Sequence, residues 1–405
     1  MKTSQTILHL DLDTFFVSVE RLQNSKLEGK PVLIGGLSDR GVVASCSYEA
    51  RRFGVHSAMP MKLARQLCPD AEIIKGDSGL YSKYSHMVTD VVKEQAPIYE
   101  KASIDEFYLD ATGMDRFFGT YKWASELRQR IIKETGLPIS FGMSTNKTVA
   151  KISTGEAKPN GQIYIVSGKE KGFLAPLPVR KIPMVGEKTT HLLHRMGVKY
   201  IYTVQEMPRE MLEGALGKPG LTLWNKAQGI DPTPVIPYVE RKSISLERTF
   251  EKDTIDVFKL KSILVAMVEE LAFQLRHGER LTSCVTVKIR YADFNTYSKQ
   301  KRVPYSSADH VLIEVVRQLF EALFDRRQLI RLIGVRFSHL VQGSYQIDLF
   351  DDTEKMVSLY EAMDKMKNRF GHEAVKRAVG MKTKNFRRGN PFNGEPPVIP
   401  AHRRS

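Results

Sequence analysis

The chain has few cysteines and no long apolar run, and each absence argues against a class of protein. Its three cysteines, Cys46, Cys68 and Cys284, lie far apart and form no C-x-x-C pair. That spacing suggests neither a zinc site nor a disulfide framework, and it fits a reducing compartment. No stretch reaches the ~20 apolar residues that a membrane span needs. The N-terminus MKTSQTILHLDLD lacks the charged and apolar segments of a signal peptide, so a cytoplasmic protein is expected.

Positive charge, in contrast, is abundant. Lys and Arg number 61 and Asp and Glu 46, which gives a net charge of +15. Such an excess favours a polyanionic partner, with nucleic acid first and an anionic membrane surface second, although charge alone also allows an unspecialised basic protein. The length suggests two to four domains, and 42% hydrophobic with 26% charged residues is typical of a folded protein.

The first 166 residues alternate between strand and helix patterns. Strands are predicted at 6–13, at 31–46 (two strands around a turn), at 98–110 (a hairpin with Ser103–Glu106 near its bend), at 138–144 and at 162–166. Helices are predicted at 14–23, 60–68, 78–95, 121–135 and 146–157. One strand-rich core with helices on one face would bury these segments.

The pattern changes after Gly172. Residues 173–240 are rich in proline and show short helical segments without a strand signal, which predicts a small all-helical domain followed by a stiff linker at 230–238. A second αβ pattern then begins. Its strands are predicted at 242–250, 281–291, 296–303 and 330–340, and its helices at 256–277 and 309–324. Residues 353–383 predict two short helices, and residues 387–405 are expected to be disordered.

Three carboxylates occupy positions that acids rarely take. Asp11 lies at the end of an apolar strand, and Asp105 and Glu106 lie at the bend of a hairpin. Burying an acid is unfavourable unless it is paired or binds a cation. Mg²⁺ prefers oxygen ligands, and two such ions roughly 4 Å apart can activate an attacking oxygen and neutralise a leaving one. Each acid alone is explained as well by a turn or cap role, which we prefer for Asp13.

Around these acids the sequence resembles the Y family of DNA polymerases, most closely its bacterial DNA polymerase IV branch. The matching stretches are HLDLDTFFVSVE (9–20), GVVASCSYEARRFGV (41–55), MPMKLARQLCPD (59–70), SIDEFYLDATG (103–113), SFGMSTNKTVAKISTGEAKPNG (140–161) and IPMVGEKTTHLLHRMGV (182–198). They occur in order and at the family's spacing over residues 6–341, which makes an accidental match very improbable.

The resemblance implies a multidomain α+β fold shaped as a right hand. A ferredoxin-like palm would comprise residues 1–16 and 76–166, the fingers 17–75, and an all-helical thumb with a helix–hairpin–helix 167–232. A linker at 233–241 would lead to an αβ little-finger domain at 242–341, which binds DNA, and a tail at 342–405 would follow. In the hairpin of the thumb, Met184 stands where the family has glycine, whereas Gly186 is retained.

The resemblance also implies the site residues. Asp11, Asp105 and Glu106, with the backbone carbonyl of Leu12, would hold two Mg²⁺ ions, and Mn²⁺ is a second candidate. The dNTP contacts would be Phe16, Ser45, Tyr48, Arg51 and Lys158, with Phe16 as the steric gate against a ribose 2′-OH. Small residues at Val42, Ala44 and Ala58 would cover the nascent base pair. Candidate phosphate contacts in the little finger are Lys288, Arg290, Lys299, Lys301, Arg302, Arg331 and Arg336.

Residues 346–350 read QIDLF and resemble a bacterial sliding-clamp-binding motif. Leu349 and Phe350 would fill an apolar pocket while Gln346 bonds at its rim. Alternatively, Leu349 and Phe350 pack onto the protein's own core.

Together these features predict a low-fidelity, template-directed DNA polymerase for translesion synthesis. It would act as a monomer, without a membrane, on primer-template DNA and dNTP, adding dNMP to a primer 3′-OH by two-metal-ion nucleotidyl transfer with release of pyrophosphate. A non-catalytic DNA-binding scaffold is the alternative, but such relatives lose the three acids. A ribonucleotide polymerase or cyclase is disfavoured by the bulky Phe16.

Overall fold

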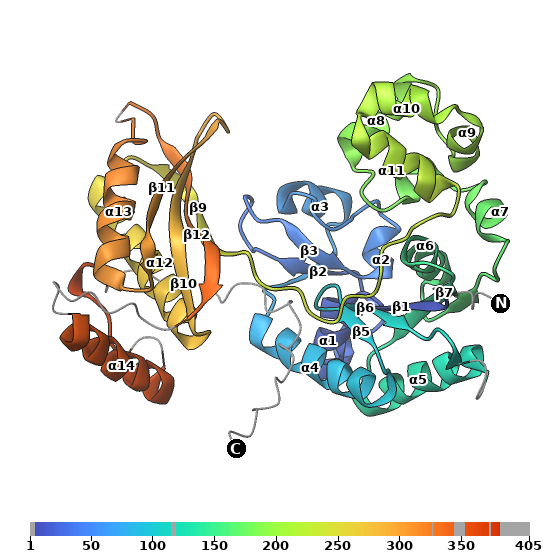
Figure 1. The fold of residues 1–405 in the computed structure, drawn as a ribbon, viewed down its shortest axis with the longest axis horizontal. Helices are drawn as coiled ribbons and strands as arrows, with labels where there is room; N and C mark the ends of the chain where they lie inside the picture. Colours follow the sequence, from blue (N-terminus) through green and yellow to red (C-terminus); the bar gives the residue numbers. More distant parts are fainter. Residues whose placement is uncertain (1–4, 115–118, 326, 344–352, 372–373, 381–405) are drawn as a thin grey trace, which may run out of the picture. The chain divides into compact units, whose positions relative to one another are not determined.

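The structure, a computed structural model, describes residues 5–114, 119–325, 327–343, 353–371 and 374–380 (Figure 1). Its internal contacts divide the chain between Val239 and Glu240 into two compact units. Within the described residues, no helix has the length and apolar character to cross a membrane.

A five-stranded sheet forms the centre of the first unit. Its order is β5 (Tyr99–Lys101), β6 (Glu106–Asp110), β1 (Ile7–Leu12), β7 (Ile139–Ser144) and β8 (Gln162–Tyr164). β1 runs antiparallel to both β6 and β7, and β8 pairs with β7 in parallel. The central position of β1 agrees with its nearly continuous burial.

Helices cover both faces of this sheet, so the prediction of helices on one face is wrong. α4 (Ser78–Gln95) and α5 (Thr120–Thr135) pack on the face to which Leu8, Leu10 and Leu12 point. α6 (Lys147–Ala157) packs on the opposite face, against β7 and β1. Gly142 permits this close approach, because a Cβ there would lie 2.3 Å from the carbonyl oxygen of Ala150 in α6.

A smaller sheet follows the first strand in sequence. It has the order β3 (Val43–Cys46), β2 (Val32–Gly35) and β4 (Glu72–Ile74), with β2 antiparallel to β3 and parallel to β4. The helices of this region are α1 (Phe15–Gln23), α2 (Tyr48–Arg51) and α3 (Met61–Leu67). The two strands around a turn at 31–46 are confirmed, whereas the short strand β4 was not predicted.

Residues 167–232 contain helices and no strand, which confirms the all-helical prediction. The helices are α7 (Glu170–Leu174), α8 (Glu187–Arg195), α9 (Ile201–Glu206), α10 (Arg209–Leu216) and α11 (Lys218–Ala227). They enclose a core of their own, which includes Leu193, Ile201, Leu212 and Leu223. Met184, in the turn before α8, has a φ of 77° and is 89% exposed.

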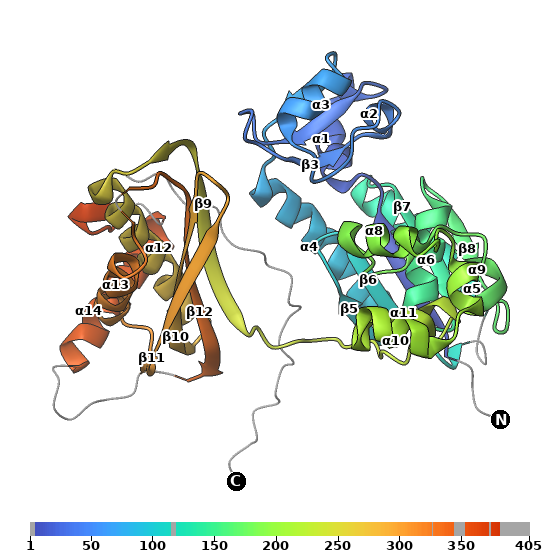
Figure 2. The same cartoon turned by 90° about the horizontal axis from the view of Figure 1, so that it is seen from above.

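The second unit has one antiparallel sheet backed by two helices. The strand order is β11 (Thr296–Ser306), β10 (Arg280–Tyr291), β12 (Ile330–Gln342) and β9 (Ser243–Thr254). α12 (Val257–His277) and α13 (Asp309–Glu321) cover one face of the sheet, as both views show (Figure 2). The register places Lys299 and Lys301 opposite Val287 and Val285, which are core residues. These two lysines therefore lie on the helix-covered face, where Lys301 Nζ donates to Gln318.

The helix after this sheet differs from its prediction. Residues 353–383 predict two short helices, but the described part of this range has one long helix, α14 (Thr353–Phe370), and a 3₁₀ turn at Ala378–Gly380. α14 docks on α12, because the Arg276 guanidinium donates to Asp364 at 2.6 Å while also pairing with buried Asp309 at 2.7 Å. The predicted disordered tail at 387–405 lies outside the described residues.

Candidate active site

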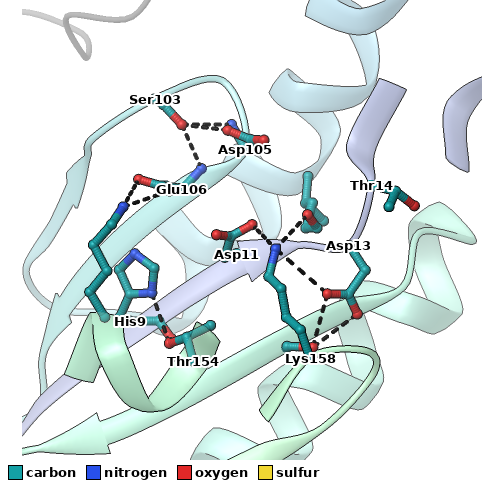
Figure 3. A network of polar contacts seen from close by, with 12 residues as sticks. His9, Asp11, Asp13, Thr14, Ser103, Asp105, Glu106, Thr154 and Lys158 are labelled. Atoms are coloured by element: carbon teal, nitrogen blue, oxygen red, sulfur yellow. Dashed lines mark hydrogen bonds and ion pairs between the residues drawn. The ribbon is translucent and has the colours of Figure 1, made fainter. Parts of the chain in front are cut away.

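Strand register brings the three predicted acids to one end of the five-stranded sheet. Asp11 of β1 lies directly opposite Glu106 of β6. The next residue of β1, Leu12, donates its N–H to the Asp105 carbonyl at 3.0 Å. Because side chains alternate along β1, Leu10 and Leu12 enter the core while His9 and Asp11 face α6. Figure 3 shows Asp11, Asp105 and Glu106 near this end of β1, with Lys158 beside Asp11.

Lysines from α6 and its C-terminus hold two of these acids. Lys158 Nζ donates to Asp11 Oδ1 and, at 3.3 Å, to the Leu12 carbonyl oxygen. Lys151 Nζ donates to both Glu106 oxygens at 2.6 Å. The third acid, Asp105, accepts from the Ser103 hydroxyl. The sequence predicted a site role for Lys158 but not for Lys151. A lysine within a predicted helix is usually a solvated surface residue, so nothing in the sequence marked Lys151 as a partner of Glu106.

The electrostatics of the cluster favour an added cation. Burial raises the pKa of Asp11 to about 7, with Lys158 opposing the shift and the neighbouring charges of Asp105 and Glu106 adding to it. Burial also raises the pKa of Asp105. Carboxylates that are crowded and partly buried are the oxygen donors that hard divalent ions prefer.

As the side chains stand, no group of three or more His, Cys, Asp or Glu in the described part of the chain is arranged to hold a metal ion. The reason is visible in Figure 3, where the acids turn towards different partners: Asp11 to Lys158, Asp105 to Ser103, and Glu106 to a lysine. Carboxylate and carbonyl oxygens are the donor types that a divalent metal prefers, and Lys158 and Lys151 now occupy two of the acids. A metal would require Asp11 and Glu106 to turn away from Lys158 and Lys151.

Asp13 is a structural acid, in agreement with its predicted role. Its side chain is buried and accepts from the Ser140 hydroxyl at 2.9 and 3.0 Å and from the Asn160 N–H at 2.6 Å. These bonds join the end of β1 to β7 and to the turn that carries Lys158. The Tyr48 hydroxyl lies at 3.5 Å from the same carboxylate.

A cavity of about 190 Å³ opens beside the acids and gathers most of the predicted nucleotide contacts. Of the predicted site residues, those that line it are Asp11, Leu12, Phe16, Ser45, Arg51, Asp105 and Lys158. Glu106 and Tyr48 are not in its lining, and Tyr48 lies instead under the Arg51 guanidinium, 5.0 Å from ring centre to Cζ. Thr14, Phe15, Ala44 and Ser57 also line the cavity. Thr14, Phe15 and Ser57 were missed by the sequence analysis, since nothing in their type marks them as ligands.

Comparison with known proteins now gives the family. The sequence model of the impB/mucB/samB family matches residues 10–155, that of the family's C-terminal domain matches 241–349, and that of the DNA polymerase-iota thumb domain matches 180–231. A DNA polymerase IV of Dehalococcoides mccartyi is 37% identical over 373 residues, covering 91% of this chain and 96% of the relative. The chain belongs to the Y family of DNA polymerases. The predicted family is therefore confirmed.

Two further matches each cover more than four fifths of this chain. A DNA polymerase IV of Treponema denticola is 38% identical over 83% of this chain and 85% of its own. Among solved structures, a chimera of the Y-family DNA polymerases Dbh and Dpo4 matches with a TM-score of 0.74 at 28% identity, covering 84% of this chain and all of the chimera. These matches confirm the multidomain α+β polymerase fold.

Proposed function

We propose that the chain is a low-fidelity, template-directed DNA polymerase that copies damaged templates. It adds dNMP to a primer 3′-OH and releases pyrophosphate. The observation that carries this proposal is the shared cavity, in which the acids Asp11 and Asp105 lie beside the cations Arg51 and Lys158. A nucleoside triphosphate needs this combination, since its phosphates require both metal ligands and basic donors.

Family membership implies a divalent metal, and we assign its binding to Asp11, Asp105, Glu106 and the Leu12 carbonyl, with Mg²⁺ as the ion used. When bound, two such ions supply Lewis acidity at the reacting phosphate. Arg51 grips phosphate oxygens through its planar fork, and Ser45 donates a hydroxyl to the same group. Lys158 would neutralise charge that develops on the phosphates.

Phe16 and three small residues, of which only Ala44 lines the cavity, select the substrate. The Phe16 ring blocks a ribose 2′-OH and thereby favours deoxyribonucleotides. Val42, Ala44 and Ala58 present little bulk to a nascent base pair, and Val42 is 50% exposed. A loose cover enforces pair shape weakly, which accounts for both lesion tolerance and low fidelity.

We assign the unit around the five-stranded sheet to palm, fingers and thumb within the ranges given above, and the second unit to the little finger. Its open sheet face carries Lys288, Arg290 and Arg336, which alternate with core residues. These cations suit phosphate contacts that hold primer-template DNA without reading its sequence. The protein would act as a monomer.

We also propose binding to a bacterial sliding clamp through Gln346, Leu349 and Phe350, which lie outside the described residues. The support is the motif and its place after the last strand of the little finger. A Leu349→Ala/Phe350→Ala variant should extend primers normally alone and lose stimulation by the clamp. Equal stimulation of both proteins would refute the assignment.

The central test is primer extension with dNTPs and Mg²⁺ on an undamaged and then a lesion-bearing template. The Asp105→Ala/Glu106→Ala variant should bind primer-template DNA and extend nothing. Asp110→Ala is the matched control, since Asp110 lies on β6 but at the far end from Glu106, and it should extend normally. DNA binding without extension by the parent protein would instead favour a non-catalytic scaffold.

A further inference from the structure

The proposed steric gate rests on an aromatic ring from another helix. The rings of Phe16 in α1 and Tyr81 in α4 are stacked, with centroids 4.3 Å apart and planes inclined by 17°. Phe16 lines the nucleotide cavity, whereas Tyr81 does not and is only 4% exposed. Tyr81 therefore lies behind the Phe16 ring, outside the cavity, with Phe15 as its second ring neighbour at 6.3 Å.

The Tyr81 ring is fixed on two further sides. Its hydroxyl donates to Glu20 Oε1 at 2.5 Å, and Glu20 lies one turn after Phe16 on α1. Gly76 closes the other side, because a Cβ there would lie 3.0 Å from both the Tyr81 hydroxyl and its ring. Burial, followed by the hydrogen bond to Glu20, raises the pKa of Tyr81 above its ordinary value, so the phenol remains a donor at neutral pH.

We propose that Glu20 and Tyr81 are positioning residues for sugar selection, in which the Glu20–Tyr81 hydrogen bond holds the ring that fixes Phe16 against a ribose 2′-OH. The inference rests on the proposed function and deepens it. A gate excludes a hydroxyl only if its ring cannot retreat. In a close-packed interior, Phe16 can retreat only into space that Tyr81 fills. If the Tyr81 ring is free to move, Phe16 can turn away from a ribose 2′-OH at less energetic cost. The lost cost is comparable to that of an off-rotamer side chain, which corresponds to about three- to tenfold in the preference for dNTP over rNTP.

The chain offers a matched control for this contact. One turn along the same two helices, Gln23 Nε2 donates to the Tyr84 hydroxyl at 3.0 Å. This second bond joins α1 to α4 as the first does, but neither residue lies in the cavity lining or stacks on Phe16. Its loss measures the effect of loosened helix packing alone.

The experiment compares kcat/KM for a dNTP with that for the rNTP of the same base, using the full chain on primer-template DNA. Glu20→Ala and Tyr81→Leu should lower the dNTP preference about three- to tenfold, mainly through a lower KM for the rNTP. Glu20→Gln retains an acceptor oxygen and should restore most of the preference. Gln23→Ala should leave the ratio unchanged. Glu20→Ala removes a partly exposed side chain, so it tests the idea even if Tyr81→Leu folds poorly.

Two outcomes would overturn the inference alone. The first is a folded Glu20→Ala variant whose dNTP preference equals that of the parent protein. The second is a Gln23→Ala variant that lowers this preference as much as Glu20→Ala does. Phe16→Ala should abolish the preference, and its failure to do so would remove the gate and the inference together. Absence of any dNTP incorporation by the parent protein would refute the proposed function itself.

Discussion

Asp11 and Glu106 are direct partners in the register of β1 and β6, yet each carboxylate pairs with a different lysine. Lys158 holds Asp11 and Lys151 holds Glu106, both from the segment that covers this face of the sheet. Acids brought so close by backbone pairing repel each other, and the lysines offset that repulsion. The acid cluster therefore needs positive charge nearby. The two lysines supply it in this structure, and a bound divalent metal would supply it in their place.

The first prediction concerns the pH dependence of metal binding. The pKa of Asp11 is raised to about 7, so this carboxyl takes up a proton as the pH falls through that value. Because a metal needs the ionised form, affinity for Mg²⁺ or Mn²⁺ should fall about tenfold per pH unit below neutrality. Calorimetric titration between about pH 6 and about pH 8 measures this slope.

A lysine variant checks the cause. The charge of Lys158 lowers the pKa of Asp11, so Lys158→Met should move the onset of the affinity loss to higher pH. Lys133→Met, on the outer helix α5, should leave it in place. Affinity that is flat across this range in the parent protein would contradict the prediction.

The second prediction concerns the stability of the metal-free protein. Burial raises the pKa of Asp105 above the unfolded value of about 3.9. The folded state then holds more protons between the two pKa values, and stability falls as the pH rises through this window. Asp105→Asn removes the charge and keeps an acceptor for Ser103. It should stabilise the chain in EDTA by about 1 kcal/mol near pH 8 and lose this gain in acid.

Urea unfolding with EDTA and with Mg²⁺ tests both halves of this expectation. Mg²⁺ should stabilise the parent protein and stabilise Asp105→Asn less. Asp110→Asn, on the same strand, is the control and should respond to Mg²⁺ as the parent does. If Asp105→Asn is less stable than the parent protein in EDTA, the ionised Asp105 carboxylate does not destabilise the folded state.

The third prediction distinguishes Asp13 from the other acids. Asp13→Ala would leave the buried Ser140 hydroxyl and the partly buried Asn160 N–H without their acceptor. Such losses cost about 3 kcal/mol together. Asp39→Ala is the control, since Asp39 pairs with Arg65 while its side chain stays 66% exposed, and its loss should cost at most about 0.5 kcal/mol. Equal unfolding midpoints for the two variants would assign Asp13 a role outside folding.

Much of the fold was predictable because local patterns and tertiary structure agree. Asp11 at a strand end and Asp105 at a hairpin bend stood out as acids, but only the family resemblance gave them a predicted metal-binding role. In contrast, β1, β7, α4 and α12 follow directly from their residue periodicity. α14 was predicted as two helices, but its sequence has no internal glycine or proline, and the helix ends only before Gly371, where φ is 90°.

What escaped prediction depends on contacts between distant segments. The strand Glu72–Ile74 is three residues long and exists because β2 pairs with it. Lys151 meets Glu106 across 45 positions of sequence, and Tyr81 meets Glu20 across 61. No periodicity encodes such pairs, and each residue type is common in its element. The same limit applies to Lys299 and Lys301, two predicted phosphate contacts whose helix-covered face is assigned only once the register is known.

The fourth prediction uses that register. Arg336 lies opposite Thr286 on the open face of the second sheet and is exposed, whereas Lys301 reaches Gln318 of α13. Each variant, Arg336→Ala or Lys301→Ala, removes one charge. Only Arg336→Ala should reduce the slope of log affinity against log salt, by about 1. Fluorescence anisotropy over a salt series measures both, and equal slopes for the two variants would exclude the open face as the DNA-binding surface.

The fifth prediction concerns Met184, which occupies a left-handed backbone position before α8. Its φ of 77° strains any side chain with a Cβ, and its 89% exposure means that few contacts offset the strain. Met184→Gly should therefore raise the free energy of unfolding by about 1 kcal/mol, reduced in part by the greater entropy of glycine in the unfolded chain. Met184→Ala is the matched control, because it removes the long side chain but keeps the Cβ and the strain. If the backbone strain is the cause, only Met184→Gly gains stability in thermal unfolding. This variant should also bind primer-template DNA more tightly, since the hairpin amides can then approach a phosphate more closely. An equal gain for Met184→Ala would assign the effect to the exposed apolar side chain instead.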